Sequence, residues 1–210
     1  MQRFTWLKTH PLTKYFGIAL IALLSIVLIT GILRPSNQTG DPLHIALVAP
    51  STSSRNEAAK QMVQSVQLYL DSVNRQGGIN GHPLKLLVYD DHDNPSSAQD
   101  VVREMEKSQA LVALGHLTST TSQAAAPVYQ ALQIPVITGT ASADALTQAN
   151  PYYFRTVFND TRQGTLLALY AQQVLKLKTA SVIASDDSLG RSLRTAFETT
   201  FGQTGTLTKS

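Results

Sequence analysis

The sequence has 210 residues, of which 43% are hydrophobic and 15% charged, and it contains no cysteine. This composition excludes a disordered chain, a disulfide scaffold and a metal site built on thiolates. The net charge of +3 could indicate a nucleic-acid partner. However, four of the 17 basic residues lie in residues 1–34, which contain no acidic residue, so the rest of the chain is nearly neutral. We therefore expect no nucleic acid to bind.

The first predicted element is an uncharged, apolar run over residues 15–33, between Lys14 and Arg34. A helix of this length would span about 28 Å, close to the thickness of the hydrocarbon core of a bilayer. Three basic residues precede the run and one follows it, which favours a cytoplasmic N-terminus. We predict an uncleaved, single-pass signal anchor, with residues 1–14 in the cytoplasm and the remainder periplasmic or extracellular. The alternative is a cleaved signal peptide, which would have a shorter apolar core and a small-residue cleavage site.

Residues 34–42 are polar, contain two prolines and a glycine, and predict a short stalk. From residue 43 onward, short apolar runs alternate with segments whose apolar residues recur at helical spacing. We predict strands over 44–49, 84–89, 110–114, 134–137, 152–157 and 180–184, and helices over 57–76, 96–108, from about 122, 161–176 and 189–201. This alternation predicts an α/β fold with a doubly wound parallel sheet.

Hydroxyl side chains follow three of the predicted strands, at the carboxyl ends where open parallel sheets bind ligands. These residues are Ser53 after the first strand, Thr118, Ser119 and Thr120 after the third, and Thr140 and Ser142 after the fourth. Hydroxyls and helix N-termini together suit a small anionic or zwitterionic group such as a carboxylate, without Lys or Arg. The alternative is that these residues only cap helices.

Motifs for catalysis, cofactors and metals are weak or absent. The sequence has no glycine-rich phosphate loop and no G-x-S-x-G nucleophile motif. His116 is expected to pack or cap rather than act as a general base. The acidic run at residues 90–94 lacks the glycine and distal glutamate of a calcium loop, so we interpret it as turn and N-cap residues. We therefore predict no cofactor, no metal and no enzymatic activity, with a Ser-dependent hydrolase as a remote alternative.

Several segments, in this order, resemble a known family: HIALVAP, VNRQGGING, LKLLVYDDHDNP, GHLTSTTSQAAAPVYQALQIPVITGTAS, YYFRTVFNDTRQG and SVIASDDSLGRSL. Over about residues 43–205 the chain is similar to type I periplasmic binding proteins of the leucine/isoleucine/valine-binding kind. The resemblance implies two α/β lobes that close on a small ligand, usually an amino acid. The bound state of such a protein is then passed to a transporter or a signalling domain.

The resemblance also implies roles for individual residues. Ser119 falls on the hydroxyl that holds the ligand carboxylate, and Ser142 on the hydroxy residue that contacts both carboxylate and amine. Thr140 falls where a backbone carbonyl accepts from the amine. Backbone N–H groups of Ser119, Thr120 and Ser142 could contribute as well.

Two positions depart from the family pattern, because Ala58 and Leu189 stand where an aromatic residue is common. Asp187 begins the second lobe's side of the cleft, where it could meet a ligand amine or simply cap a helix. Leu189 belongs to the same edge.

By this resemblance, residues 43–157 form the first ligand-binding lobe and residues 158–210 begin the second. Members of the family are considerably longer, so we expect a truncated second lobe of marginal stability. The absent part would carry the acidic residue that usually pairs with the ligand amine.

The function that follows from the sequence is a membrane-anchored solute-binding protein. We expect it to bind an amino acid or similar carboxylated solute and to deliver it to the permease of an ABC-type importer. The alternative is the ligand-sensing ectodomain of a membrane signalling receptor with the same fold.

Overall fold

The computed structural model describes residues 39–208, except for residues 53–55 and 149. The predicted membrane anchor, residues 15–33, lies outside this described part, as do residues 1–14 and most of the predicted stalk. Among the described residues, none of the helices has both the length and the apolar character needed to cross a membrane.

A five-stranded parallel sheet forms the centre of the described chain, in the order β2-β1-β3-β4-β5. Its strands are β1 (Leu43–Val48), β2 (Leu84–Tyr89), β3 (Val112–Leu114), β4 (Val136–Thr138) and β5 (Tyr153–Arg155). Each was predicted from its apolar run, although β3, β4 and β5 are shorter than those runs. The parallel α/β sheet is therefore confirmed.

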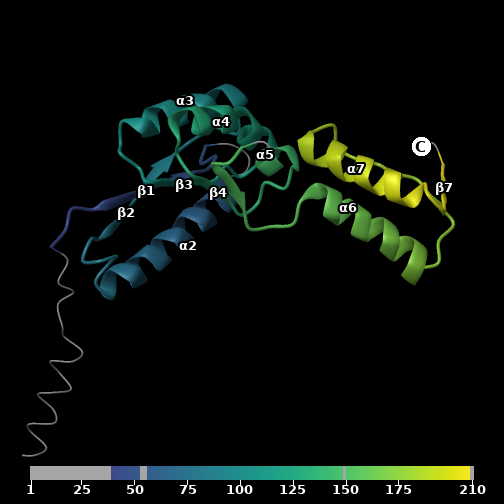
Figure 1. Ribbon diagram of the computed structural model, residues 1–210, viewed down its shortest axis with the longest axis horizontal. Coiled ribbons are helices and arrows are strands. Elements are labelled where there is room, and N and C mark those ends of the chain that lie inside the picture. Colours follow the sequence, from purple (N-terminus) through teal and green to yellow (C-terminus); the bar gives the residue numbers. More distant parts are fainter. Residues whose placement is uncertain (1–38, 53–55, 149, 209–210) are drawn as a thin grey trace, which may run out of the picture. The chain divides into compact units, whose positions relative to one another are not determined.

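The helices connect these strands, as Figure 1 shows. They are α2 (Asn56–Arg75), α3 (Pro95–Glu106), α4 (Ser119–Leu132) and the short α5 (Ala145–Gln148). The helix expected from about residue 122 begins at Ser119, because the Thr118 side chain caps it by accepting from the backbone N–H of Thr121.

A second set of elements follows β5: α6 (Asp160–Leu169), the π-helical turn η1 (Tyr170–Val174), β6 (Thr179–Ala180), α7 (Ser188–Phe201) and β7 (Thr206–Leu207). β6 and β7 pair in parallel, and α6 packs closely on α7 at Gly164 and Ala196. The exposed large hydrophobic side chains of α6 and η1 are Leu166, Leu167, Tyr170 and Val174.

The main core lies on one face of the sheet, under α3 and α4, while α2 lies on the opposite face (Figure 1). Small and branched strand residues Ala46, Val48, Ala113 and Val136 are fully buried there. They contact the apolar stripes of α3 and α4, with Val102, Met105, Ala125 and Tyr129 among the core residues.

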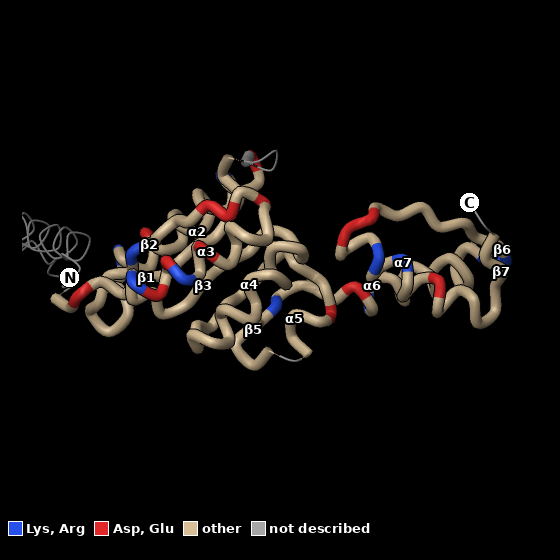
Figure 2. The backbone as a smooth tube through the Cα atoms, turned by 90° about the horizontal axis from the view of Figure 1, so that it is seen from above, with Lys and Arg blue, Asp and Glu red and all other residues tan. Residues whose placement is uncertain are grey.

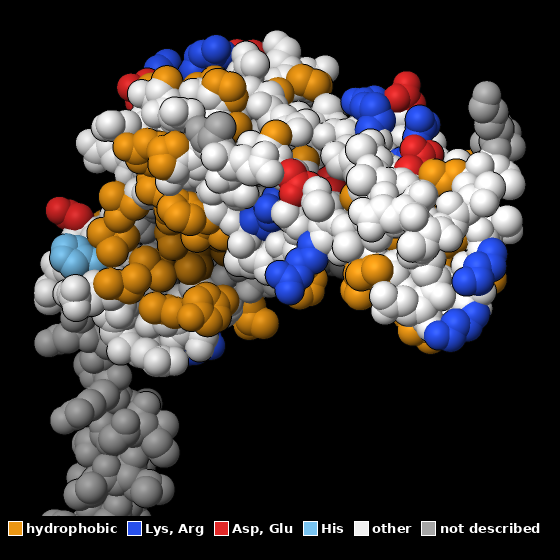
Figure 3. Space-filling model, turned by 45° about the vertical axis from the view of Figure 1, so that its right-hand side comes forward, with side chains coloured by type: hydrophobic (Ala, Val, Ile, Leu, Met, Phe, Trp, Pro, Cys, Tyr) orange, Lys and Arg blue, Asp and Glu red, His pale blue; other side chains and the backbone are white. Residues whose placement is uncertain are grey.

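The opposite face carries a continuous apolar row across the sheet. The strand register places Leu47 beside Val88 and Leu114, Leu114 beside Ile137, and Ile137 beside Phe154. Paired residues in adjacent strands point to the same face. Val88 and Phe154, at the two ends of the row, are 47% and 52% exposed. Figure 3 shows a broad area of exposed hydrophobic side chains on the described chain.

Charged residues are distributed over the sheet with its helices and over the elements that follow β5, with acidic and basic positions interspersed (Figure 2). This distribution agrees with the near neutrality calculated for the chain beyond residue 34.

Candidate functional site

A cleft of about 590 Å³ lies where the loops after β2, β3 and β4 meet the first turns of α2, α4 and α7. Every predicted site residue within the described chain lines this cleft, whereas Ser53 lies outside the described residues. The lining residues are Glu57, Ala58, Asp93, Leu117, Thr118, Ser119, Thr120, Thr140, Ser142, Asp187 and Leu189.

The N-terminus of α4 points its backbone donors toward this cleft. Ser119 and Thr120 occupy its first two positions, where an N–H has no intrahelical acceptor. Thr118 satisfies the N–H of Thr121, 3.3 Å away, and so leaves the two earlier donors for other partners. A helix N-terminus with lining hydroxyls is suited to an anionic group.

Ser119 joins two of the cleft loops. Its side chain is buried, and its Oγ accepts from the backbone N–H groups of Ser142 and Ala143 at 3.2 and 3.3 Å. Both acceptor positions of the hydroxyl are thereby used, and its proton is oriented toward other acceptors. The Ser142 N–H, which the resemblance offered as a ligand donor, donates to Ser119 in this structure.

Thr140 holds the same two loops together from the other side. Its hydroxyl donates to the backbone carbonyl of Leu117 at 2.7 Å. Thr138, fully buried at the end of β4, donates to the carbonyl of His116 and accepts from the N–H of Ala141. These bonds fix the carboxyl ends of β3 and β4 relative to each other, so the lining hydroxyls are positioned before a ligand arrives.

Asp187 is the N-cap of α7, because its carboxylate accepts from the N–H of Gly190 at 2.7 Å. This is the capping role that the sequence allowed, and the residue also lines the cleft. The next residue, Ser188, donates to the side chain of Gln123 on α4 at 2.8 Å. Leu189 is 42% exposed and adds an apolar surface to the same edge.

A buried polar network supports the cleft from beneath. Asp91 and His116 are fully buried, with Nδ1 of the histidine 2.7 Å from Oδ2 of the aspartate. Nε2 of His116 lies 3.3 Å from the hydroxyl of Tyr129. His116 is thus a packed residue, as expected, and both of its ring nitrogens are engaged away from Ser119.

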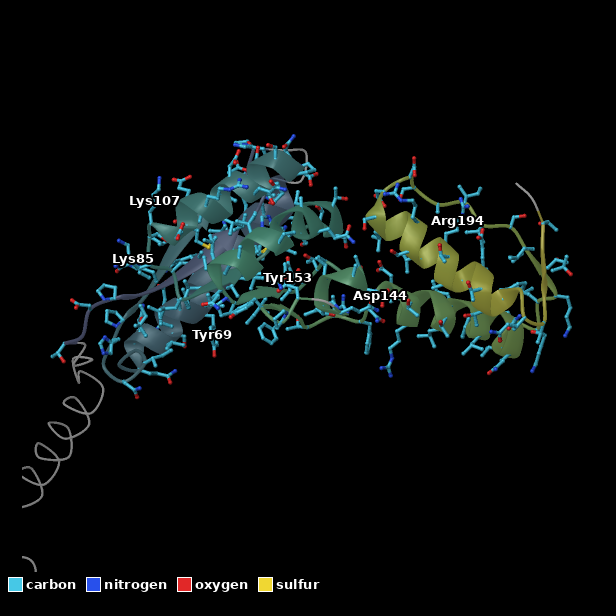
Figure 4. All side chains as sticks on the ribbon, turned by 45° about the horizontal axis from the view of Figure 1, so that its top comes forward. Tyr69, Lys85, Lys107, Asp144, Tyr153 and Arg194 are labelled. Atoms are coloured by element: carbon cyan, nitrogen blue, oxygen red, sulfur yellow. The ribbon has the colours of Figure 1, made fainter. Side chains whose placement is uncertain are left out.

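Two buried tyrosines in this region have raised pKa values. Burial raises the pKa of Tyr129 well above its ordinary value, and it raises the pKa of Tyr153 to about 12. Tyr153, labelled in Figure 4, donates from its hydroxyl to the backbone carbonyl of Gly115. Gly115 itself approaches β1 so closely that a Cβ would lie 2.4 Å from the carbonyl oxygen of Val48.

The loop after β4 is also joined to the start of α6, at a second buried carboxylate. The N–H of Asp160 donates to the carbonyl of Ser142 at 3.0 Å. Its two carboxylate oxygens are buried without a well-formed hydrogen bond in the described chain. Burial raises the pKa of Asp160, although the hydroxyls of Ser142 and Ser192 oppose part of that shift.

Asp144 secures the same junction, beside the start of α6 (Figure 4). Its carboxylate accepts from the N–H and the hydroxyl of Thr161, both at 3.0 Å, and from the side-chain amide of Asn159.

Asp93 and Glu57 also line the cleft, although the sequence did not predict them as site residues. Asp93 follows β2, so the rule that selected the other loops, the carboxyl ends of parallel strands, would also have selected it. The acidic run was instead interpreted as turn and cap residues, a role that Asn94 does fill by accepting from the N–H groups of Ser96 and Ser97. Glu57 carries no comparable signal, since an acidic residue in a first helical turn is common.

Taken together, the parallel sheet and the polar cleft at its strand ends define an α/β ligand-binding domain. The pattern of the family described as "Periplasmic binding protein" matches residues 42–207. The chain belongs to this family.

Among curated proteins, the chain is 26% identical over 170 residues to a leucine-, isoleucine-, valine-, threonine- and alanine-binding protein of Pseudomonas aeruginosa. The alignment covers 80% of this chain and 46% of that protein. The chain therefore spans about half the length of the curated relatives that it matches.

Two solved structures share the fold. One is the branched-chain amino acid transporter substrate-binding protein of Streptococcus pneumoniae, in complex with isoleucine. It matches with a TM-score of 0.73 and 21% identity over 80% of this chain and 48% of that chain. The other is a solute-binding protein of an ABC transporter from Rhodopseudomonas palustris, in complex with 3,4-dihydroxybenzoic acid. It has a TM-score of 0.72 and 21% identity, over 80% of this chain and 46% of that chain.

Proposed function

We propose that the cleft binds an amino acid or a similar small solute that carries a carboxylate, and that the protein is the substrate-binding component of an ABC-type importer. One observation carries this proposal. The buried hydroxyl of Ser119 and the first N–H groups of α4, which have no acceptor within the helix, converge on one cleft. Among the described residues that line this cleft, none is Lys, Arg or His.

A carboxylate fits this arrangement on physical grounds. It can accept from the hydroxyl proton of Ser119 and from the N–H groups of Ser119 and Thr120. Bonds from a neutral donor to a charged group contribute about 1.5–3 kcal/mol each. The partial positive charge of the helix N-terminus adds a favourable term.

The remaining lining residues complete the proposed recognition. Ser142 is the second hydroxyl next to the carboxylate, and the backbone carbonyl of Thr140 would accept from a ligand amine. Thr118 lies at the helix cap, and Asp187 and Leu189 form the opposing edge. No catalytic step is part of this proposal, because the curated relative and the two solved relatives are named as binding proteins.

The proposed membrane anchor and the extracytoplasmic location of the binding domain rest on the sequence alone. The apolar run at residues 15–33 would anchor the chain in the membrane and place the binding domain outside the cytoplasm, close to a permease. Alkaline extraction of membranes tests the anchor. The full chain should remain in the membrane fraction, whereas a chain that begins at residue 36 should be released.

Binding is tested with the full 210-residue chain by thermal shift and isothermal titration, over a panel of amino acids and short carboxylic acids. A ligand at about 100 times its dissociation constant should add about 2.7 kcal/mol to the stability of the folded state. If no carboxylate-bearing compound shifts the unfolding transition, the proposal is wrong.

The site itself is tested by Ser119→Ala, which we expect to weaken binding by about 1–3 kcal/mol. Ser65→Ala is the matched control, because Ser65 lies on α2 and its hydroxyl donates only to the carbonyl of Gln61. Both variants are compared by dissociation constant as well as melting temperature, since removing the Ser119 hydroxyl also frees two backbone N–H groups. An unchanged dissociation constant for Ser119→Ala would place the ligand elsewhere.

A further inference from the structure

A buried hydrogen-bonded pair joins two of the loops beneath the cleft. Asp91 follows β2 and His116 follows β3, the two strands on either side of β1. Both side chains are fully buried, and Oδ2 of Asp91 lies 2.7 Å from Nδ1 of His116. The pair therefore ties together two loops that are separated by the carboxyl end of β1.

Both members of the pair are held in one orientation. Oδ1 of Asp91 accepts from the backbone N–H of Asp93 at 3.1 Å, so each carboxylate oxygen has a partner. A carboxylate only accepts hydrogen bonds, and Nδ1 of His116 therefore carries the proton that the two share. Nε2 lies 3.3 Å from the hydroxyl of Tyr129, which holds the ring at its other end.

The backbone of His116 connects the pair to the loop after β4. Its carbonyl oxygen accepts from the hydroxyl of Thr138 at 3.2 Å and from that of Thr140 at 3.4 Å. The Thr138 hydroxyl in turn accepts from the backbone N–H of Ala141 at 3.0 Å. The next residue is Ser142, which lines the cleft. Hydrogen bonds thus run without a break from the buried pair to the loop that carries a cleft hydroxyl.

A contribution to stability does not by itself explain a polar pair at this place. Replacing both partners of a buried hydrogen bond by apolar groups of the same shape can be nearly neutral for stability. A fully bonded polar network instead makes one arrangement of its groups more favourable than the others. Here the groups so arranged belong to the loops after β2, β3 and β4, which all contribute to the cleft.

We propose that Asp91 is a positioning residue for the candidate ligand site and that it acts through His116. The pair fixes the loop after β3, and the hydroxyls of Thr138 and Thr140 fix the loop after β4 on it. Neither Asp91 nor His116 lines the cleft, so neither is expected to touch a ligand. The inference rests on the proposed function for its ligand, but the position of the loops can be measured without one.

Hydrogen–deuterium exchange of the full chain, followed by mass spectrometry, measures the loop directly. His116→Gln removes the bond to Asp91, because the longer side chain carries its amide beyond the former place of Nδ1. We expect a peptide over residues 139–143 to exchange about tenfold faster in this variant, as the loss of one hydrogen bond implies. The rate is expressed relative to a peptide from β1, an interior strand that reports unfolding of the sheet.

Two further variants serve as controls for the exchange measurement. His116→Asn is the conservative rescue, because its shorter side chain places an amide N–H near the former Nδ1, where it can donate to Asp91. It should restore most of the protection that His116→Gln loses. Val102→Ala removes a fully buried apolar side chain from α3, so it should lower stability without raising the relative rate of the loop.

Ligand affinity is the second readout, by isothermal titration of the same chains with isoleucine and 3,4-dihydroxybenzoic acid as carboxylate probes. His116→Gln should weaken the binding of a probe about tenfold, and His116→Asn should restore most of that affinity. Thr138→Val interrupts the same path at its other end, since Thr138 is fully buried and does not line the cleft. It should also weaken binding, and its result replaces that of His116→Gln if the latter chain does not fold.

The outcomes separate the inference from the proposed function. If His116→Gln and His116→Asn give the same exchange and the same affinity, Asp91 does not act through His116 and the inference is overturned. The same conclusion follows if Val102→Ala raises the relative rate of the loop as much as His116→Gln does. If the parent chain binds neither probe while the exchange follows the expected pattern, the positioning of the loops stands and the assignment of these ligands fails.

Discussion

Two buried carboxylates show how the same residue type has opposite effects on the stability of one fold. Asp91 is fully buried beside His116, so its charge has a partner at hydrogen-bond distance. Asp160 is fully buried as well, but its oxygens lack a well-formed hydrogen bond in the described chain. Removal of a buried partner leaves an unsatisfied polar group, whereas removal of an uncompensated charge relieves a penalty.

For the paired residue, Asp91→Ala should lower the free energy of unfolding by about 1–3 kcal/mol, because a fully buried ring nitrogen of His116 loses its hydrogen-bond partner. Urea denaturation measures this change. Asp100→Ala is the control, since the exposed Asp100–Arg103 pair should contribute less than about 1 kcal/mol. Equal losses in the two variants would contradict this account of the buried pair.

For the other carboxylate, the pKa of Asp160 is raised above its ordinary value of 3.8 by burial. The folded state thus binds the proton of Asp160 more tightly than the unfolded state does. Protonation of Asp160 therefore stabilises the folded state below pH 3.8, and this stabilisation is lost as the pH rises through the folded-state pKa. Asp160→Asn should therefore stabilise the protein at neutral pH, with a gain that vanishes toward pH 3. Melting temperatures of both proteins across this pH range test the prediction, and a loss of stability at pH 7 would refute it.

At the scale of elements, capping residues in the sequence predict where some helices begin, whereas the contacts between helices have no comparable signal in the sequence. Asn94 before Pro95 predicted the start of α3, and its side chain does cap the first turn. The start of α4 was placed too late, because five consecutive hydroxyl residues, 118–122, are all capable caps. The tight contact of α6 with α7 at Gly164 was not predicted, since no local pattern marks which glycine faces another helix.

Gly164 in α6 provides the test at this scale. In an isolated helix, Gly→Ala is favourable by about 1 kcal/mol. Here the new Cβ would lie 2.6 Å from Cβ of Ala196 and 2.7 Å from the backbone oxygen of Leu193. Because this overlap involves backbone, steric strain should exceed the helical gain, and we expect Gly164→Ala to destabilise the protein by about 1–3 kcal/mol.

Thermal or chemical denaturation of this variant measures the change. Gly139→Ala is the comparison, because its Cβ would meet only the Thr156 hydroxyl at an ordinary 3.8 Å. Greater stability of Gly164→Ala than of the parent protein would show that the two helices separate readily at this point.

At the scale of the whole molecule, the sequence predicted the layers and the site loops but not the contacts that cross between segments. The apolar runs and helical spacings were sufficient for the parallel sheet, and the loops that follow its strands led to the cleft hydroxyls. Asp91 and His116 are 25 residues apart, and only the pairing of strands through β1 brings them together. The short elements α5 and β7 were missed because four and two residues are too few to show a period.

The uneven covering of the sheet predicts how the chain behaves in solution. The row from Val88 to Phe154 ends in half-exposed apolar side chains, and exposed apolar faces promote association. The double variant Val88→Lys, Phe154→Lys should therefore self-associate less than the parent chain in sedimentation velocity experiments. Ile183→Lys is the control, because Ile183 is 92% exposed but is not part of the row. Equal association in all three proteins would show that this face is not responsible.

The strand order also bears on how the protein is built during synthesis. All five strands come from one continuous stretch, residues 43–155, and β3, β4 and β5 are added successively along one side of β1. Each strand can therefore pair with a neighbour that has already left the ribosome or the translocation channel. The sheet can grow at the pace of chain emergence, and the hydroxyl-bearing loops after β3 and β4 reach their final partners as soon as β4 has joined.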